Sequence, residues 1–269
     1  MIVNICKICE SSKGEIVLDI SNEKDTYLDY INIPYEGINT QYKECSKCGL
    51  IFRSHILSDE EKNLLYEKFR DIELRGESKK EYFIRITSLP DEKSENREKC
   101  NYLRSFINES GNVLDVGCGA GVFLYKFKQE FKKWSAVGVE PTNEFSNEAE
   151  KYGIKIKYGY LNEQTFNKKF DLITMIHVLE HVDNLRDILT QVKSYMHEDS
   201  LFYIEVPNSK DIGDLPKSHD RFMSQHDYIF SSRVLEKLLL DSGYIMIDMQ
   251  EFKSIRNRNN LRGMFKIKI

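Results

Sequence analysis

From residue 111 onward, apolar residues alternate between short continuous runs and spacings of three and four. The short runs predict buried strands at 113–116, 134–139, 154–158, 172–176, 201–206 and 244–249. The wider spacings predict helices at 122–131, about 142–152, 185–196 and 232–241. Alternation of this kind is typical of a mostly parallel sheet with helices on both faces. The apolar, basic ending at 264–269 predicts a last strand at the sheet edge.

The first part of the chain has shorter and more polar elements. Residues 16–20 predict a strand of a small strand-and-turn module. Ser58 and Glu61 match the S-x-x-E capping box that begins many helices. A highly charged stretch at 71–95 predicts a linker with a short helix, and a further helix is expected over about 92–109.

Composition and charge limit the classes of protein. The chain has 269 residues, 41% of them hydrophobic, which is enough for a folded core. Its formal net charge is −4, so we expect no nucleic acid as a partner. No apolar run approaches the ~20 residues of a membrane span, and the first ten residues show no signal-peptide pattern. We therefore expect a cytoplasmic protein with no membrane span.

Four of the six cysteines form two C-x-x-C pairs. The pairs are Cys6 with Cys9 and Cys45 with Cys48. Two intervening residues let both thiolates of a tight turn face one ion, and two such turns make a closed tetrahedral zinc site. The alternatives are a redox dithiol and four unrelated thiols. The repeated spacing favours zinc, in a structural role because no coordination position stays open.

A glycine-rich turn follows the first strand of the alternating region. Gly117 and Gly119 permit a sharp turn and let a ligand approach the backbone and the start of the next helix. Asp115 lies at the end of the strand, where its carboxylate can receive an ammonium group. Glu140 ends the next strand, where a carboxylate can accept both hydroxyls of a ribose. A dinucleotide-binding dehydrogenase uses a similar turn, and this alternative stays open on these residues alone.

Three segments in sequence resemble the class I S-adenosylmethionine-dependent methyltransferases. They are V-L-D-V-G-C-G-A-G from Val113, G-V-E-P-T from Gly138 and F-D-L-I-T-M-I-H-V-L-E-H-V from Phe170. The resemblance covers about 111–250 and implies a doubly wound, mostly parallel, seven-stranded Rossmann-like α/β sheet. It also implies S-adenosylmethionine as the cofactor. The G-x-G-x-G spacing and the third segment favour this class over the dehydrogenase.

The resemblance assigns the cofactor residues. The first segment is expected to hold the methionine end, Glu140 the ribose, and the backbone near Leu161 the adenine. Cys118 would be a small filler beside the cofactor, and Tyr82 would fold over it. The predicted cofactor-binding residues are Asp115, Gly117, Cys118, Gly119, Glu140, Leu161, His177 and Tyr82.

The N-terminal part extends the resemblance. The first C-x-x-C, the segment Y-x-x-C-x-x-C-G-L-I-F from Tyr42 and the following S-D-E-E-x-x-x-L-Y helix resemble zinc-ribbon methyltransferases of bacterial sugar and glycan pathways. This implies a zinc ribbon over 1–55, a helical bridge over 56–110 and a methyltransferase domain over 111–269. The implied acceptor is a hydroxyl or carbon of a sugar, nucleotide-linked or in a glycan precursor, as in polysaccharide biosynthesis.

Two histidines are candidate catalytic residues. Carbon-methylating members of that group carry a Glu-His pair before an F-S helix start, and Gln225-His226 stands at this place here. Methyl transfer to a hydroxyl requires in-line positioning and removal of a proton, which a histidine can perform near neutral pH. We expect His226 to be this base, although a purely structural loop histidine is the alternative. His177 is expected at the carboxyl end of its strand, beside the ligands.

The segment from His177 to His181 leaves two interpretations open. With Glu180 and His226, its histidines could chelate a metal, as in a related RNA-terminal methyltransferase group with an E-V-I-E-H segment. The favoured interpretation is that the segment only lines the pocket. Two alternative functions follow: a metal-assisted nucleic-acid methyltransferase, and a zinc-ribbon binding module with a vestigial cofactor domain.

Overall fold

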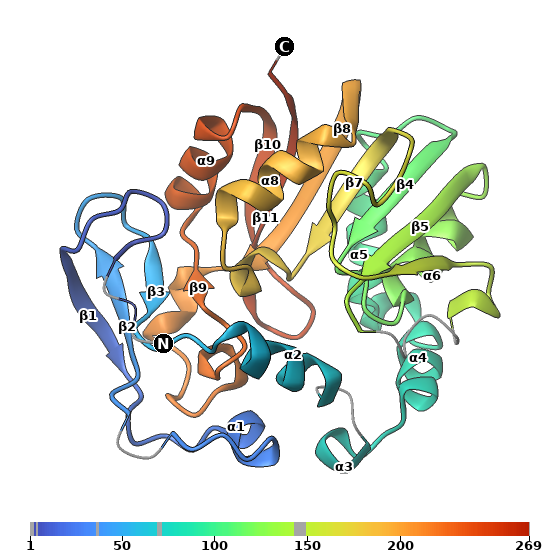
Figure 1. Cartoon of the computed structure of the whole chain (residues 1–269). Coiled ribbons are helices and arrows are strands. Elements are labelled where there is room, and N and C mark those ends of the chain that lie inside the picture. The colour runs from blue at the N-terminus through green and yellow to red at the C-terminus, as the bar shows by residue number, and fades with distance from the viewer. Residues whose placement is uncertain (1–2, 4, 36–37, 69–71, 143–148, 269) are drawn as a thin grey trace.

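A computed structural model of the chain describes residues 3, 5–35, 38–68, 72–142 and 149–268 (Figure 1). These residues form a seven-stranded and a four-stranded β-sheet, with helices packed around them. None of the described helices is long and apolar enough to cross a membrane.

The seven-stranded sheet has the order β10-β11-β8-β7-β4-β5-β6. Its strands are β4 (Gly111–Val116), β5 (Trp134–Glu140), β6 (Lys155–Tyr158), β7 (Phe170–Ile176), β8 (Met196–Pro207), β10 (Tyr244–Lys253) and β11 (Asn259–Ile267). Neighbours from β6 to β8 pair in parallel, and only β11 runs antiparallel to both of its neighbours. This architecture confirms the predicted α/β Rossmann-like methyltransferase sheet.

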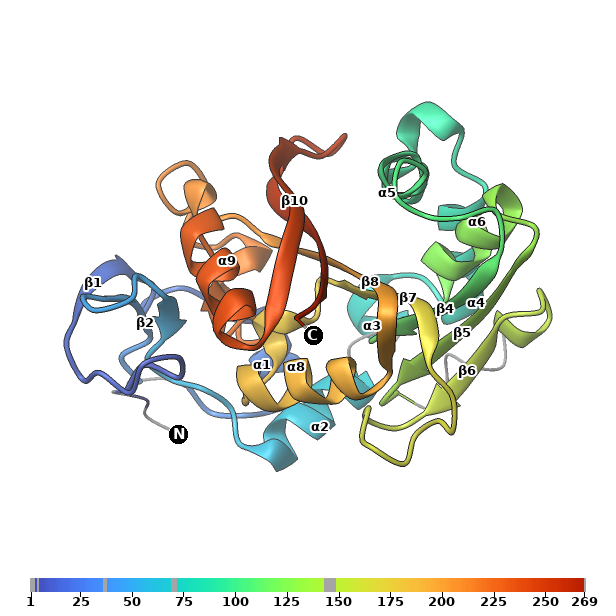
Figure 2. The ribbon, with the colours of Figure 1, turned by 90° about the horizontal axis from the view of Figure 1, so that it is seen from above.

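Alternate residues of the central strands pack on opposite faces of this sheet. Leu114 and Ile173 belong to one core cluster, together with apolar residues of α8 (Leu185–Ser194) and α9 (Ser232–Asp241). Val113 and Leu172 belong to a second cluster, with residues of α5 (Glu95–Leu103) and α6 (Val122–Glu130). Figure 2 shows α5 and α6 on one side of the sheet and α8 on the other. The sheet is therefore covered on both faces, as predicted.

Several predicted boundaries need correction. The last strand is not at the sheet edge, because β11 turns back from β10 and inserts between β10 and β8, leaving β10 as the edge. The predicted helix over 92–109 is α5, which ends at Leu103. Met196 begins β8 instead of ending the preceding helix. Most of the helix predicted over 142–152 lies outside the described residues.

The four-stranded sheet has the order β1-β2-β3-β9. Its strands are β1 (Gly14–Asp19), β2 (Gln41–Cys45), β3 (Ile51–Arg53) and β9 (Tyr228–Ile229). The first three come from the predicted N-terminal module, but β9 comes from the methyltransferase part and pairs antiparallel with β3. The two predicted parts of the chain thus share one sheet.

The short helix α1 (Thr26–Tyr30) lies between β1 and β2 of the small sheet. The helices α2 (Asp59–Lys68), α3 (Ile72–Arg75) and α4 (Lys79–Thr87) follow β3 and, with α5, lead to the large sheet. The predicted capping box at the start of α2 is present, since the Glu61 backbone N–H donates to Ser58 Oγ and the Ser58 N–H donates to Glu61 Oε2. In Figure 1, α2 passes beneath the ends of β7 and β8.

Candidate functional site

The glycine-rich turn joins the end of β4 to the start of α6. Gly117 and Gly119 have φ values of 69° and 51°, in the left-handed region that favours glycine. A Cβ atom on Gly117 would lie 2.5 Å from a methyl group of Val178, so a side chain is excluded there. A Cβ atom on Gly119 would meet no other atom within 4 Å. The turn therefore leaves open space at Gly119, directly before the start of α6, where a ligand can approach.

Glu140 lies against this turn at the carboxyl end of β5. Its Oε2 atom accepts a hydrogen bond from the Gly119 backbone N–H at 2.9 Å, and its Oε1 atom accepts from the Thr142 N–H at 3.1 Å. Both oxygen atoms of an ionised carboxylate are acceptors, as a contact to hydroxyl groups requires. The position fits the predicted contact to a ribose.

Asp115 is buried one strand away. Its Oδ1 atom accepts a hydrogen bond from the Thr174 hydroxyl at 2.6 Å. Burial, together with the nearby charge of Glu140, raises the pKa of Asp115 to about 7. A carboxyl group with this pKa is readily ionised by an arriving ammonium group.

The other predicted cofactor residues have different environments. The Cys118 side chain points into the core, where its sulfur fills the space that a Cβ atom on Gly138 would need. Leu161 is likewise buried in the core, beside Val139. At both positions only the backbone could face a cofactor. Tyr82 packs with a small apolar cluster that includes Ala120 of the glycine-rich turn, so it lies near the turn.

His177 lies between two carboxylates at the end of β7. Its Nδ1 atom is 3.2 Å from Glu180 Oε1, and its Nε2 atom is 3.2 Å from Glu205 Oε1. Although burial opposes the charge, these two carboxylates raise the pKa of His177 to about 9. Both ring nitrogens are then protonated at neutral pH. His177 therefore fits an electrostatic or positioning role, because a protonated ring cannot accept a proton.

Glu205, on β8, was not found by sequence reasoning. Lys99 Nζ lies 3.2 Å from its Oε1 atom, and the Tyr203 hydroxyl donates to its Oε2 atom at 2.6 Å. The pKa of Glu205 is lowered to about 2, because Lys99 and His177 outweigh the effect of burial. The only signal in the sequence is a charged residue inside an otherwise apolar strand.

His226 stacks on His181, with ring centroids 4.8 Å apart and planes inclined by 22°. His226 Nδ1 lies 2.9 Å from the carbonyl oxygen of Arg221, and His181 Nδ1 contacts the carbonyl oxygen of Gln225. A carbonyl can only accept, so each Nδ1 carries a hydrogen, and in a neutral ring the lone pair is then on Nε2. Burial and the neighbouring His181 lower the pKa of His226 to about 3. His226 is therefore neutral at neutral pH, as a proton acceptor must be.

Glu180 stands beside these two rings. Its carboxylate is buried, and no hydrogen-bond partner among the described residues reaches its Oε2 atom. One ligand atom each from Glu180, His181 and His226 lies within 4.8 Å of the others. The structure thus brings together three of the four residues considered for a metal, while His177 pairs with carboxylates instead.

The loop that carries His226 has charged partners that sequence reasoning missed. Lys62 Nζ on α2 lies 2.5 Å from both Asp183 Oδ1 and Asp227 Oδ2. Lys62 and Asp227 are both buried, so their charges compensate each other. No local pattern marks these residues, because their partners lie more than a hundred positions away in the chain.

The four cysteines of the predicted zinc site meet at one end of the four-stranded sheet. Cys6 Sγ is 3.4 Å from Cys48 Sγ, and Cys9 Sγ is 3.4 Å from Cys45 Sγ. All four sulfur atoms lie within 4.8 Å of one another, and none is in a disulfide. Tetrahedral Zn–S bonds of about 2.3 Å place sulfur atoms slightly less than 4 Å apart. The donor set and its spacing fit a zinc ion.

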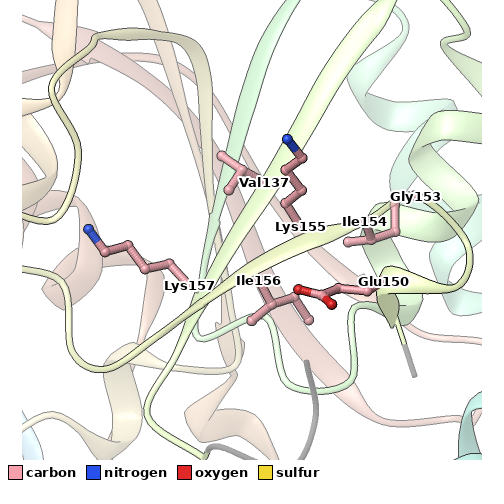
Figure 3. A pocket seen from close by; sticks show the side chains of 7 residues that line it. All are labelled: Val137, Glu150, Gly153, Ile154, Lys155, Ile156 and Lys157. Atoms are coloured by element: carbon pink, nitrogen blue, oxygen red, sulfur yellow. The ribbon is translucent and has the colours of Figure 1, made fainter. Parts of the chain in front are cut away.

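An open hollow lies on the outer part of the large sheet, between β6 and the segment that precedes it (Figure 3). It is lined by Val137, Glu150, Gly153, Ile154, Lys155, Ile156 and Lys157. None of the predicted site residues lines it. The predicted residues Asp115, Gly117, Gly119, Glu140 and His177 lie instead at the carboxyl ends of β4, β5 and β7, where open α/β sheets bind ligands.

Comparison with known proteins identifies the family. A family model described as "Methyltransferase domain" matches residues 90–248, which is more than half of the chain. The chain therefore belongs to the methyltransferase-domain family. Its fold is that of the class I S-adenosylmethionine-dependent methyltransferases.

Individual relatives are more distant. A probable (S)-tetrahydroprotoberberine N-methyltransferase 2 of Papaver bracteatum is 28% identical over 131 residues, covering 46% of this chain and 37% of the relative. The alignment thus spans well under half of that relative's length. A coclaurine N-methyltransferase structure with N-methylheliamine and S-adenosylhomocysteine has a TM-score of 0.54 at 13% identity, covering 74% of this chain and 82% of that chain. A methyltransferase structure from Clostridium acetobutylicum has a TM-score of 0.51 at 14% identity, covering 68% and 94%.

Proposed function

We propose that this chain transfers the methyl group of S-adenosylmethionine to a small-molecule acceptor. The observation that carries the proposal is the Glu140 carboxylate lying against an open glycine-rich turn, in a chain of the methyltransferase-domain family. In this proposal Asp115 receives the ammonium group of the cofactor, and Glu140 the ribose hydroxyls. The backbone at Gly117, Cys118, Gly119 and Leu161 completes the site, and Tyr82 flanks it.

His226 is the proposed base. The cofactor supplies an activated methyl group, so the protein must hold the acceptor in line and remove its proton. The neutral ring of His226, with a free lone pair on Nε2, can take that proton. The protonated ring of His177 pairs with Glu180 and Glu205 and orients them, and Glu180 in turn lies beside His226.

The acceptor is proposed from two separate arguments. The cysteine pairs and the helix that follows resemble zinc-ribbon methyltransferases of sugar and glycan pathways, which supports a sugar hydroxyl or carbon. The sequence relative described above, from Papaver bracteatum, is named as an N-methyltransferase, which supports an amine. An amino sugar would satisfy both.

We propose a structural zinc ion at Cys6, Cys9, Cys45 and Cys48, supported by the sulfur positions described above. The boundaries at residues 55 and 110 remain predictions.

A metal-assisted methyltransferase is the second candidate. The cluster of Glu180, His181 and His226 favours it, because two Nε2 lone pairs and a buried carboxylate oxygen lie close together. In that case His226 would be a ligand and could not act as the base. A nucleic-acid acceptor is disfavoured by the net charge of −4.

Transfer of a labelled methyl group from S-adenosylmethionine tests the proposal. The acceptors are a pool of nucleotide-linked sugars, a pool of amines including amino sugars, and RNA. Label in a sugar or an amine supports the proposed function and separates the two acceptor classes. Label in RNA alone, dependent on an added divalent ion, favours the second candidate. Cofactor binding without transfer to any acceptor favours a binding module with a vestigial cofactor domain.

A further inference from the structure

The loop at 220–227 carries His226 between a short 3₁₀ turn and strand β9. The His226 N–H donates only within a turn, to the Met223 carbonyl at 3.1 Å, while the Asp227 N–H donates to the Glu180 carbonyl at 2.9 Å. A catalytic ring must be held to within a fraction of an ångström of its productive place. The contacts that hold this loop therefore decide whether His226 can act.

Two residues of the N-terminal part form hydrogen bonds to the backbone of the loop. The Tyr42 hydroxyl donates to the carbonyl oxygen of His226 at 2.7 Å. Arg53 Nη1 donates to the carbonyl oxygen of Phe222 at 2.9 Å, and the Arg53 backbone N–H donates to the Asp227 carbonyl at 2.9 Å. The loop is thus held at His226 itself and on both sides of it.

Tyr42 and Arg53 are buried, and they belong to a hairpin that pairs with the strand after the loop. Tyr42 has no exposed surface and Arg53 is 3% exposed, so the polar groups of both side chains are directed into the protein. They face each other as cross-strand partners in β2 and β3, and β3 also pairs with β9 immediately after the loop. Cys45 is the last residue of β2, and Cys48 lies in the turn that joins β2 to β3. One hairpin therefore connects the cysteine cluster to the loop.

A third residue locks this hairpin to the same loop. Asp25 accepts a hydrogen bond from the Ser224 backbone N–H at 2.7 Å and lies 3.6 Å from Arg53 Nη2. Asp25 also caps α1 through the N–H groups of Tyr27 and Leu28. The charge of Arg53 is therefore compensated inside the protein, and its guanidinium remains fixed toward the loop.

We propose that Tyr42 and Arg53 are positioning residues for methyl transfer, which set the place of the His226 ring from the N-terminal part of the chain. This inference rests on the proposed role of His226. It assigns to the N-terminal part a role in turnover besides any role in holding a metal.

The test compares two Tyr→Phe variants that remove equivalent hydroxyl groups. Tyr42→Phe removes the donor to His226, while Tyr244→Phe removes a buried hydroxyl that donates to the Leu189 carbonyl at 2.6 Å, away from the loop. We expect Tyr42→Phe to lower kcat by about 10- to 100-fold with unchanged affinity for S-adenosylmethionine. Tyr244→Phe should lower Tm to a similar extent and leave kcat within about twofold. Equal losses of kcat in the two variants would overturn the proposal.

A double-mutant cycle tests whether Tyr42 acts through His226. Adding Tyr42→Phe to His226→Asn should cause no further loss of kcat, because the group being positioned is already gone. A further loss of the same size as in the single variant would refute the positioning role and leave the base role intact. An unchanged kcat in His226→Asn alone would instead refute the base role, and the positioning proposal with it. If Tyr42→Phe fails to fold, Arg53→Lys is the substitute test, because it keeps the charge beside Asp25. Arg53→Lys should also lower kcat, and an unchanged kcat in Arg53→Lys would count against the proposal.

Discussion

The proposed cofactor side and the proposed acceptor side of the site are built in different ways. On the cofactor side, Gly119 and Glu140 are 21 residues apart and lie at the ends of neighbouring parallel strands. On the acceptor side, Tyr42 and His226 are 184 residues apart, and Lys62 and Asp227 are 165 apart. The first arrangement follows from one strand–turn–helix unit and the next strand. The second exists only when the N-terminal part has folded onto the large sheet.

This difference predicts that the two sides can be damaged separately. A change on the cofactor side should weaken binding of S-adenosylmethionine. A change on the acceptor side should lower turnover and leave that binding intact.

The largest effect is expected from loss of the proposed zinc ion at the four cysteines. Structural zinc contributes about 10–16 kcal/mol in small metal-binding peptides, comparable with the whole net stability of a domain, so the β2–β3 hairpin should come apart. Turnover should fall more than about 100-fold while calorimetry still detects cofactor binding. Zinc content, turnover and cofactor affinity are measured for Cys48→Ser and for chelator-treated protein. Full turnover in a protein shown to contain no metal would contradict the expected dependence of the acceptor side on the N-terminal part.

A smaller effect, on cofactor binding instead of turnover, is expected from Glu140→Ala. The variant loses an acceptor of charge-assisted hydrogen bonds to the ribose, which are worth about 1.5–3 kcal/mol, so the Kd for S-adenosylmethionine should rise about 10- to 100-fold. Glu109→Ala is the matched control, because that carboxylate is on the surface in an exposed ion pair with Lys133. Equal Kd values for the Glu140 variant and the wild type would remove Glu140 from the ribose site.

The smallest effect concerns the pH dependence of stability, through the pairing of His177 with Glu180 and Glu205. Its carboxylate partners raise its pKa in the folded protein from the ordinary 6.5 to about 9. The pairing therefore stabilises the fold fully below pH 6.5, and this stabilisation is lost as the pH rises toward about 9. The side chain is 38% exposed, so solvent screens part of the effect. The free energy of unfolding in urea should fall over this range in the wild type and less steeply in His177→Asn; identical slopes would contradict the assignment.

The same difference explains what the sequence could predict. Gly117, Gly119 and Glu140 lie at the ends of strands whose order and type follow from apolar runs, so their meeting was predictable. The place of β11 was not, because an apolar ending predicts a strand and does not say where it inserts. His226 was found only through a resemblance. Tyr42, Arg53 and Lys62, which hold the loop around His226, give no local signal. A buried tyrosine or lysine looks like any other until the distant chain segment is in place.

Calorimetric titration of S-adenosylmethionine into His226→Asn, with labelled methyl transfer measured on the same sample, tests the division of the site most directly. The structure predicts a Kd equal to that of the wild type together with a loss of turnover of about 100-fold or more, because the base is removed and the cofactor side is untouched. A Kd that weakens in parallel with turnover, or turnover that survives, would contradict the separation of the cofactor and acceptor sides.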